Sequence, residues 1–350
     1  MQFCLCNRRL ISVYFRLIIQ QNMLIQVVYS TITMTIHALD LDEIMALSCQ
    51  NAVLHHQLLT HAESLEYSNL LIRRFHVKSM TNSTVKKLYF LDFGHIDAEK
   101  GWFLPGGGTF SNKNPPREYI TTQVTGVVLE YDDGYMLIDT GVHPEAKKLW
   151  PKDSWESFPV TRFSDENKLE NQLKKIKLTF ADITHVLLTH LHLDHVGQAY
   201  NFVDYKTPLV VHIKELEYAL VQIWNGKMGA YVPTDFDPLR GAEWRMIDSK
   251  DTYNLVPGVD LVFAGGHTPG SMMIQVETKK GNKYLITGDF LHEPNEYYQE
   301  AKGWLLGNSY EWFLNLRKLK LSESTKKTKV IISHDPDFWT KYPKSPNFLD

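Results

Sequence analysis

The chain has 350 residues, of which 43% are hydrophobic and 22% are charged, and its formal net charge is −3. This composition is that of a globular protein with a large apolar core, in one large or two ordinary domains, and it gives no support for nucleic acid or an anionic membrane as a partner. Only three cysteines occur, Cys4, Cys6 and Cys49, so no disulfide framework is predicted and a reducing cytoplasm is the expected location.

The first 79 residues differ in pattern from the rest. Residues 10–36 are rich in β-branched side chains, but polar residues such as Arg16 and Asn22 interrupt them, whereas a membrane-spanning helix needs about 20 mostly apolar residues. Arg8 and Arg9 would suit the start of a signal peptide, yet no clean apolar segment or cleavage site follows. We expect residues 1–79 to be an extension outside the catalytic fold, as an early start codon would produce, and residues 80–350 to be the functional domain.

A strand predicted over residues 88–94 is followed by an apolar, glycine-rich loop at residues 101–108. Three consecutive glycines and a proline exclude regular structure in this loop. The side chains of Trp102, Phe103 and Leu104 are larger and more apolar than a solvated linker requires. The loop is therefore a candidate wall for an apolar substrate, and a loop folded back onto the core is the alternative.

Two strands predicted over residues 121–130 and 135–139 flank Asp132-Asp133-Gly134, which is a hairpin signal. The second strand ends on Asp139, whose carboxylate would either orient the ligands of a metal site or form an Asx turn. Apolar residues at helical spacing predict a helix over residues 165–176, and a strand over residues 182–188 follows.

Four potential metal ligands occur within six residues directly after that strand: His190, His192, Asp194 and His195. Imidazole nitrogens and carboxylate oxygens suit zinc and similar first-row divalent ions. A core or solvated role explains one histidine well, but it explains three histidines and an aspartate after a buried strand poorly. The stretch therefore predicts a metal site.

Three further candidate ligands lie at the ends of later apolar runs. His267 occupies a glycine-rich turn between predicted strands at 259–263 and 272–276, Asp289 follows residues 285–286, and His334 follows residues 330–332. Seven ligands predict two ions with one shared carboxylate. Between these motifs we expect a strand at 209–212, a helix at 214–224, an aromatic loop at 225–240 and an amphipathic helix at 304–319.

This ligand pattern resembles that of the metallo-β-lactamase fold superfamily, and the later spacings resemble its N-acyl-homoserine lactone lactonase branch. The resemblance covers roughly residue 86 to the C-terminus and implies a four-layer αββα sandwich of the α/β class. It implies two divalent ions, with zinc expected, and a catalytic part for Asp194. By the same resemblance, Asp139 would support the site without binding an ion. The ligands would be His190, His192 and His267 for one ion and Asp194, His195 and His334 for the other, with Asp289 bridging the two ions.

One position departs from that branch. The family typically has a tyrosine three residues after the bridging aspartate, and this chain has His292 there. A histidine can donate a hydrogen bond to a developing oxyanion or protonate an alkoxide, so we expect a catalytic role for His292. A bystander role is the alternative.

Two ions joined by a carboxylate leave room for a bridging hydroxide, which is a nucleophile at neutral pH. The resemblance makes the ring ester of an N-acyl-homoserine lactone the expected substrate, that is, a small molecule with an apolar acyl chain. The alternatives are a glyoxalase II-like thioesterase, for which Lys326, Lys327 and Lys329 would bind a carboxylate, a phosphodiesterase, or a metal-binding protein without catalysis. No nucleic acid or membrane partner is expected, and the sequence does not decide whether the protein forms a homodimer.

Overall fold

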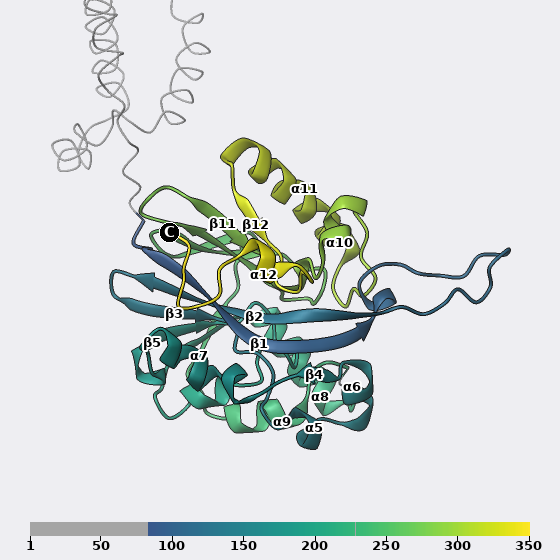
Figure 1. The fold of residues 1–350 in the computed structure, drawn as a ribbon, viewed down its shortest axis with the longest axis horizontal. Helices are drawn as coiled ribbons and strands as arrows, with labels where there is room; N and C mark the ends of the chain where they lie inside the picture. The colour runs from purple at the N-terminus through teal and green to yellow at the C-terminus, as the bar shows by residue number, and fades with distance from the viewer. Residues whose placement is uncertain (1–82, 228) are drawn as a thin grey trace, which may run out of the picture. The chain divides into compact units, whose positions relative to one another are not determined.

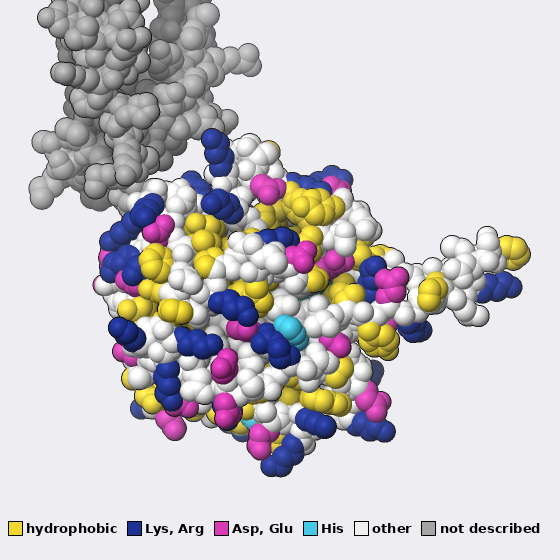
Figure 2. All heavy atoms as spheres, in the orientation of Figure 1, with side chains coloured by type: hydrophobic (Ala, Val, Ile, Leu, Met, Phe, Trp, Pro, Cys, Tyr) yellow, Lys and Arg dark blue, Asp and Glu magenta, His cyan; other side chains and the backbone are white. Residues whose placement is uncertain are grey.

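The computed structural model describes residues 83–227 and 229–350 (Figure 1). The predicted N-terminal extension, residues 1–79, and the three cysteines lie outside the described residues. Among the residues that are described, no helix is long and apolar enough to cross a bilayer. On the face shown in Figure 2, basic and acidic side chains are interspersed.

The first sheet has seven strands in the order β4-β1-β2-β3-β5-β6-β7. The hairpin predicted around Asp132-Asp133-Gly134 joins β2 to β3 in antiparallel register, whereas β3, β5, β6 and β7 are mutually parallel. The sheet is therefore mixed. Its strands are β1 (Lys87–Glu99), β2 (Tyr119–Tyr131), β3 (Gly134–Ile138), β4 (Val160–Arg162), β5 (Ile183–Leu187), β6 (Leu209–His212) and β7 (Trp244–Ile247).

The second sheet has five strands in the order β12-β11-β10-β9-β8. Only the β11–β12 pair is parallel, and the other pairs are antiparallel. This sheet is also mixed, and its last two strands run in the same direction toward the same edge. Its strands are β8 (Thr252–Val256), β9 (Val259–Phe263), β10 (Met272–Glu277), β11 (Lys283–Ile286) and β12 (Lys329–Ile331).

Helices cover the outer faces of both sheets (Figure 1). Those between β3 and β7 pack on the first sheet, whereas α10 and α11 pack on the second, and α12 lies near the C-terminus. The helices are α5 (Ala146–Leu149), α6 (Lys152–Ser157), α7 (Leu169–Lys175), α8 (Ile213–Trp224), α9 (Pro233–Phe236), α10 (Pro294–Gln299), α11 (Ser309–Lys326) and α12 (Phe338–Lys341).

Three apolar clusters separate the four layers. The central cluster joins the facing sides of the two sheets, for example Phe90 and Leu129 from the first and Leu261 and Ile274 from the second. A second cluster lies between the first sheet and its helices, and a third lies between the second sheet and α11, around Trp312. Side chains alternate between the two faces of a strand, so each sheet contributes to two clusters. The arrangement confirms the predicted αββα sandwich.

Most predicted elements occur with shifted ends, and two need correction. The helix predicted over residues 165–176 is a 3₁₀ turn, Asp165–Asn167, followed by α7, because Asn167 is tied to the Asp92 carbonyl by a 3.0 Å hydrogen bond. The helix predicted to begin at Trp304 begins at Ser309. The residues of its expected first turn are not helical, and the Trp304 N–H donates instead to the Trp102 carbonyl at 2.9 Å.

The N-cap of α11 offers a test of this boundary. Asn308 Oδ1 accepts from the backbone N–H of Tyr310 at 2.8 Å and from that of Glu311 at 3.2 Å. Asn308→Ala should lower the free energy of unfolding by about 1 kcal/mol, the usual value of such a cap, in urea denaturation. Asn308→Asp keeps an acceptor and should retain most of the stability. Equal losses in both variants would contradict the capping role.

Candidate metal centre

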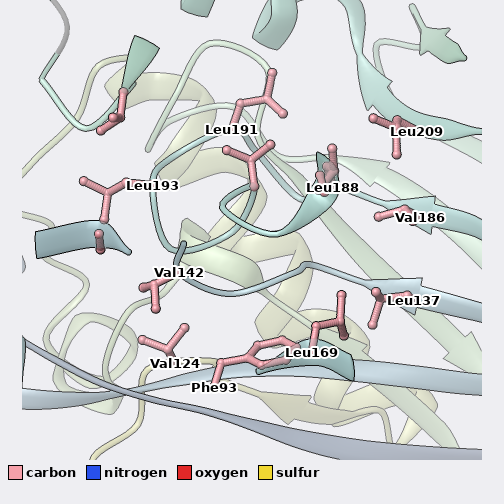
Figure 3. Packing of buried hydrophobic residues seen from close by; sticks show 14 of the residues in the cluster. Phe93, Val124, Leu137, Val142, Leu169, Val186, Leu188, Leu191, Leu193 and Leu209 are labelled. Carbon is pink, nitrogen blue, oxygen red and sulfur yellow. The ribbon is translucent and has the colours of Figure 1, made fainter. Parts of the chain in front are cut away.

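The loop after β5 carries its ligands on one side because its apolar residues are anchored on the other. Leu191 and Leu193 alternate with the ligand residues, and both are buried in the apolar cluster between the first sheet and its helices, to which Val142 and Val124 also belong (Figure 3). The Leu193 N–H also donates to the Ala230 carbonyl at 3.0 Å. Burying the two leucines thus turns the residues that alternate with them, His190, His192 and Asp194, toward the other side of the loop.

Two groups of buried ligand atoms meet at this edge of the sheets. Within each group, one ligand atom per residue lies within 4.8 Å of the others. The ligands converge because β5 in the first sheet and β11 in the second each end just before a ligand segment. The first group consists of His190, His192, His267 and Asp289, and the second consists of Asp194, His195 and His334.

Asp289 stands between the two groups, on a 3₁₀ turn (Gly288–Phe290) after β11. Its Oδ1 lies 3.1 Å from His195 Nε2 and 3.0 Å from His334 Nε2. Its Oδ2 lies 3.6 Å from His190 Nε2 and 3.5 Å from His267 Nε2. Each carboxylate oxygen therefore faces a different group, which is the geometry that a bridging ligand needs.

Asp139 orients the second group from behind. Its Oδ2 lies 2.8 Å from His195 Nδ1 and accepts from Thr189 Oγ1 at 2.8 Å, and its Oδ1 accepts from the Thr189 N–H at 2.8 Å. With Nδ1–H held by the carboxylate, His195 presents its Nε2 lone pair to the site. Asp139 itself has a φ of 56°, a left-handed conformation that is costly for a residue other than glycine and that clusters at functional sites.

His334 is oriented in the same manner by the backbone. Its Nδ1 lies 2.6 Å from the Gln123 carbonyl of β2, so Nδ1 carries the hydrogen and Nε2 is free to face Asp194 Oδ2 at 3.3 Å. The two sheets thereby hold the site together, since Gln123 belongs to the first sheet and His334 follows the last strand of the second.

The donor set fits a pair of divalent ions. Burial lowers the pKa of His190 and His267 well below the ordinary value, and that of His192 to about 3, so these imidazoles are neutral and keep their lone pairs. The fully buried His190 Nε2 has no hydrogen-bond partner among the described residues, although an unpaired buried polar atom is costly. A cation at the centre of the group would satisfy it.

Charge in the second group points the same way. Burial alone would lower the pKa of His195, but Asp289, Asp194 and Asp139 raise it well above the ordinary value. The pKa of His334 is also raised, because the lowering effect of burial is outweighed, chiefly by the effect of Asp289. The cluster of carboxylates therefore favours positive charge at this point, and a divalent ion supplies it in place of the two protons.

Glu215 links the two ligand segments and was not singled out from the sequence. It is fully buried on α8, and its Oε1 accepts from the Leu191 N–H at 3.0 Å. Its Oε2 accepts from Thr268 Oγ1 at 2.5 Å and from the Gly270 N–H at 3.2 Å. One carboxylate thus fixes both the loop of His190 and His192 and the turn of His267. No local motif marks it, because all its partners are distant in sequence or on other elements.

A small cavity opens beside the ligands, with mostly apolar walls. Its volume is about 20 Å³, close to the roughly 10–15 Å³ that one water needs. Among the predicted pocket residues, Phe103 lines the cavity, whereas Trp102 and Leu104 do not. Trp102 packs instead on the rings of Phe158 and Trp304 at 5.6 and 5.1 Å. The full lining is Ile96, Phe103, Thr122, Phe158, His192, Leu193, Asp194, Ala230, Asp289, His292, Trp304 and His334.

His292 lies in the cavity wall between the ligands and Phe103. Its Nε2 is 3.1 Å from Asp289 Oδ2, and its ring centroid is 4.7 Å from that of Phe103. Behind the ring lies a fully buried ion pair, Lys302 with Glu296, whose Nζ–Oε1 distance is 3.0 Å. Neither member of this pair was predicted, since a lone lysine and glutamate in a polar segment carry no sequence signal.

The lysines considered for binding a carboxylate lie away from the metal ligands. Lys326 ends α11, and Lys329 begins β12. His334 follows the opposite, carboxyl end of β12, and the other strand-borne ligands share that edge. Lys329 Nζ instead lies over the ring of Tyr284, 5.6 Å from its centroid. This placement gives no support to a glutathione thioester as the substrate.

Comparison with known proteins identifies relatives of the chain. A sequence profile of the metallo-beta-lactamase superfamily matches residues 120–334, more than half of the chain. The N-acyl homoserine lactonase AttM of Azorhizobium caulinodans is 29% identical over 235 residues, which are 64% of this chain and 86% of that protein. An N-acyl homoserine lactonase of a Bacillus species is 27% identical over 256 residues, which are 72% of this chain and 94% of that protein.

The fold is similar to that of Bacillus thuringiensis AiiA. A solved structure of an AiiA variant with N-decanoyl-L-homoserine bound at the active site matches with a TM-score of 0.65. The match covers 76% of this chain and 100% of that chain at 23% identity. Identity at this level supports the shared fold and nothing finer.

Removing the carboxylate behind His195 tests the orientation of the second group. Asp139→Asn keeps the size of the side chain but cannot accept from both Thr189 and His195, so zinc affinity should fall by roughly 10–100-fold. Competition with a chromophoric chelator measures the affinity, and circular dichroism checks the fold. Asp237→Asn, at an exposed carboxylate, is the matched control. An unchanged affinity in Asp139→Asn would show that His195 needs no such anchor.

Proposed function

Because the chain belongs to the metallo-beta-lactamase superfamily, we propose that it is a dinuclear metal-dependent hydrolase that opens the ring of N-acyl-homoserine lactones. The observation that carries the proposal is the position of Asp289, whose two oxygens face two groups of buried ligands beside an apolar cavity. The lactonases to which the chain is similar support the substrate class.

Two divalent ions held by the two groups would lower the pKa of a water and polarise the lactone carbonyl. The chain's own residues prepare that chemistry. Asp139 and the Gln123 carbonyl hold the rings of His195 and His334 in fixed orientations. Asp194, which lies 3.3 Å from His334 Nε2, completes the second group. The two anchored histidine rings therefore need not reorient when charge develops.

We infer that His292 acts on the substrate. Its Nε2 lies at the cavity wall beside Asp289, where an N–H would donate to the carbonyl oxygen as negative charge develops on it. In the net reaction, the ring C–O bond breaks, the hydroxyl of water joins the carbonyl carbon, and a proton reaches the departing alkoxide. His292 takes the part for which the resembled family uses a tyrosine.

The apolar cavity walls suit the acyl chain. Phe103, Phe158 and Trp304 lie around the opening, and Trp304 stacks on His192 with 5.2 Å between ring centroids and 9° between planes. A cavity of about 20 Å³ is too small for an acyl chain, so these side chains must move when substrate enters. Each methylene buried among them would contribute up to about 0.8 kcal/mol.

The proposed ions are zinc and the proposed location is the cytoplasm. Five imidazoles and two carboxylates are donors that zinc accepts readily, and three cysteines in 350 residues give no disulfide framework.

A substrate panel tests the proposal. The zinc-loaded protein should hydrolyse four- and twelve-carbon N-acyl-homoserine lactones, with a lower KM for the longer chain because more apolar surface is buried. An acyl-glutathione thioester and a bis-phosphodiester should react poorly, and chelated protein is the control. Activity on the thioester with none on any lactone would refute the proposed substrate. Equal efficiency on both chain lengths would remove the apolar walls from the substrate site.

A further inference from the structure

Two charged side chains lie fully buried behind His292, on the side away from the cavity. Lys302 Nζ is 3.0 Å from Glu296 Oε1 and 3.2 Å from Oε2, and both side chains have no exposed surface. The backbone N–H of His292 donates to Glu296 Oε2 at 2.6 Å. A buried ion pair seldom contributes much to stability, so its position against a residue of the cavity wall points to a functional role.

Lys302 has three hydrogens and three acceptor groups around it. These are the Asp289 carbonyl at 2.8 Å, the Glu296 carboxylate, and Nδ1 of His292 at 2.8 Å. An ammonium group donates three hydrogen bonds and accepts none. The two oxygens of one carboxylate lie too close together to receive two tetrahedrally spaced hydrogens. The third hydrogen of Lys302 therefore has His292 Nδ1 as its acceptor.

We propose that the buried Lys302–Glu296 pair fixes His292 as the tautomer that carries its hydrogen on Nε2. Nδ1 then accepts from Lys302, and Nε2, which lies 3.1 Å from Asp289 Oδ2, carries its hydrogen at the cavity wall. Lys302 and Glu296 are positioning residues, since neither lines the cavity. The catalytic use of this N–H rests on the proposed lactonase function, whereas the tautomer itself does not.

The opposite tautomer is disfavoured by the same contacts. A hydrogen on Nδ1 would donate to Glu296 Oε1 at 3.0 Å, but it would also place two donors, Nδ1–H and the Lys302 ammonium, 2.8 Å apart. One lysine hydrogen would then lack an acceptor in a fully buried place, which is costly.

The fixed tautomer explains how His292 can lie beside the metal ligands without being a metal ligand itself. A metal ligand must offer a lone pair, and His292 offers an N–H to the site instead. His292 is not a member of either ligand group, and its Nε2 is as near to Asp289 as that of His195. The ring thus acts as a neutral donor, which is the property that a tyrosine hydroxyl would supply at this position.

A two-bond ¹H–¹⁵N correlation spectrum of the zinc-loaded protein, labelled with ¹⁵N-histidine, tests the tautomer directly. The His292 signals are those lost in His292→Tyr. They should show a protonated Nε2 and an unprotonated Nδ1. A hydrogen on Nδ1 alone, or on both nitrogens, would overturn the proposal. The spectrum needs no substrate, so it decides the tautomer even if every lactone proves inert.

A pair of variants tests the positioning role. Lys302→Met should lower kcat for lactone hydrolysis by roughly 10–100-fold, as loss of an orienting partner does, with zinc content unchanged. In the His292→Tyr background the same substitution should cause no comparable loss, because a hydroxyl has no tautomer to fix. Equal losses in both backgrounds would make Lys302 merely structural and refute this role.

The matched control is Lys320→Met, at a partly exposed lysine paired with Glu300 on the surface; it should leave kcat unchanged. If Lys302→Met does not fold, the wild-type spectrum still decides the proposal.

Discussion

Seven candidate metal ligands are buried together at one edge of two sheets, and their mutual electrostatics govern the rest of the site. Two carboxylates and five imidazoles cannot share a water-poor space unless each polar atom has a partner. The pKa of Asp289 is a measure of this coupling. Burial alone would raise it, but His334, His195 and the other nearby histidines hold it well below the ordinary value. A cationic centre is what this arrangement accommodates.

The groups that hold the ligands in place by hydrogen bonds define the site as much as the ligands do. Asp139 orients His195, the Gln123 carbonyl orients His334, and Glu215 ties the two ligand segments together. These partners come from both sheets and from α8, so the site is formed only when the layers have packed. The strained φ of Asp139 persists because three hydrogen bonds at its carboxylate over-determine that conformation.

The sequence predicts the features of the site that depend on local order along the chain. Closely spaced ligands after an apolar run, and single ligands at the ends of later runs, are sufficient to predict the seven candidates. The fold class also needs the resemblance of this pattern to a known superfamily. Glu215, Glu296 and Lys302 escape such reasoning, since only the packing brings them to the site. Phe103 reaches the cavity while Trp102 next to it does not, and the helix expected from Trp304 begins at Ser309. Both outcomes depend on the backbone hydrogen bond from Trp304 to Trp102, which joins two segments about 200 residues apart in the sequence.

Titration of metal-free protein with zinc, followed by the initial rate of acyl-homoserine lactone hydrolysis, tests the central claim most directly. The shared position of Asp289 predicts that the rate rises until two equivalents of zinc are bound and then levels off. Full activity with one equivalent, or activity that survives complete chelation, would contradict a catalytic centre built on two ions.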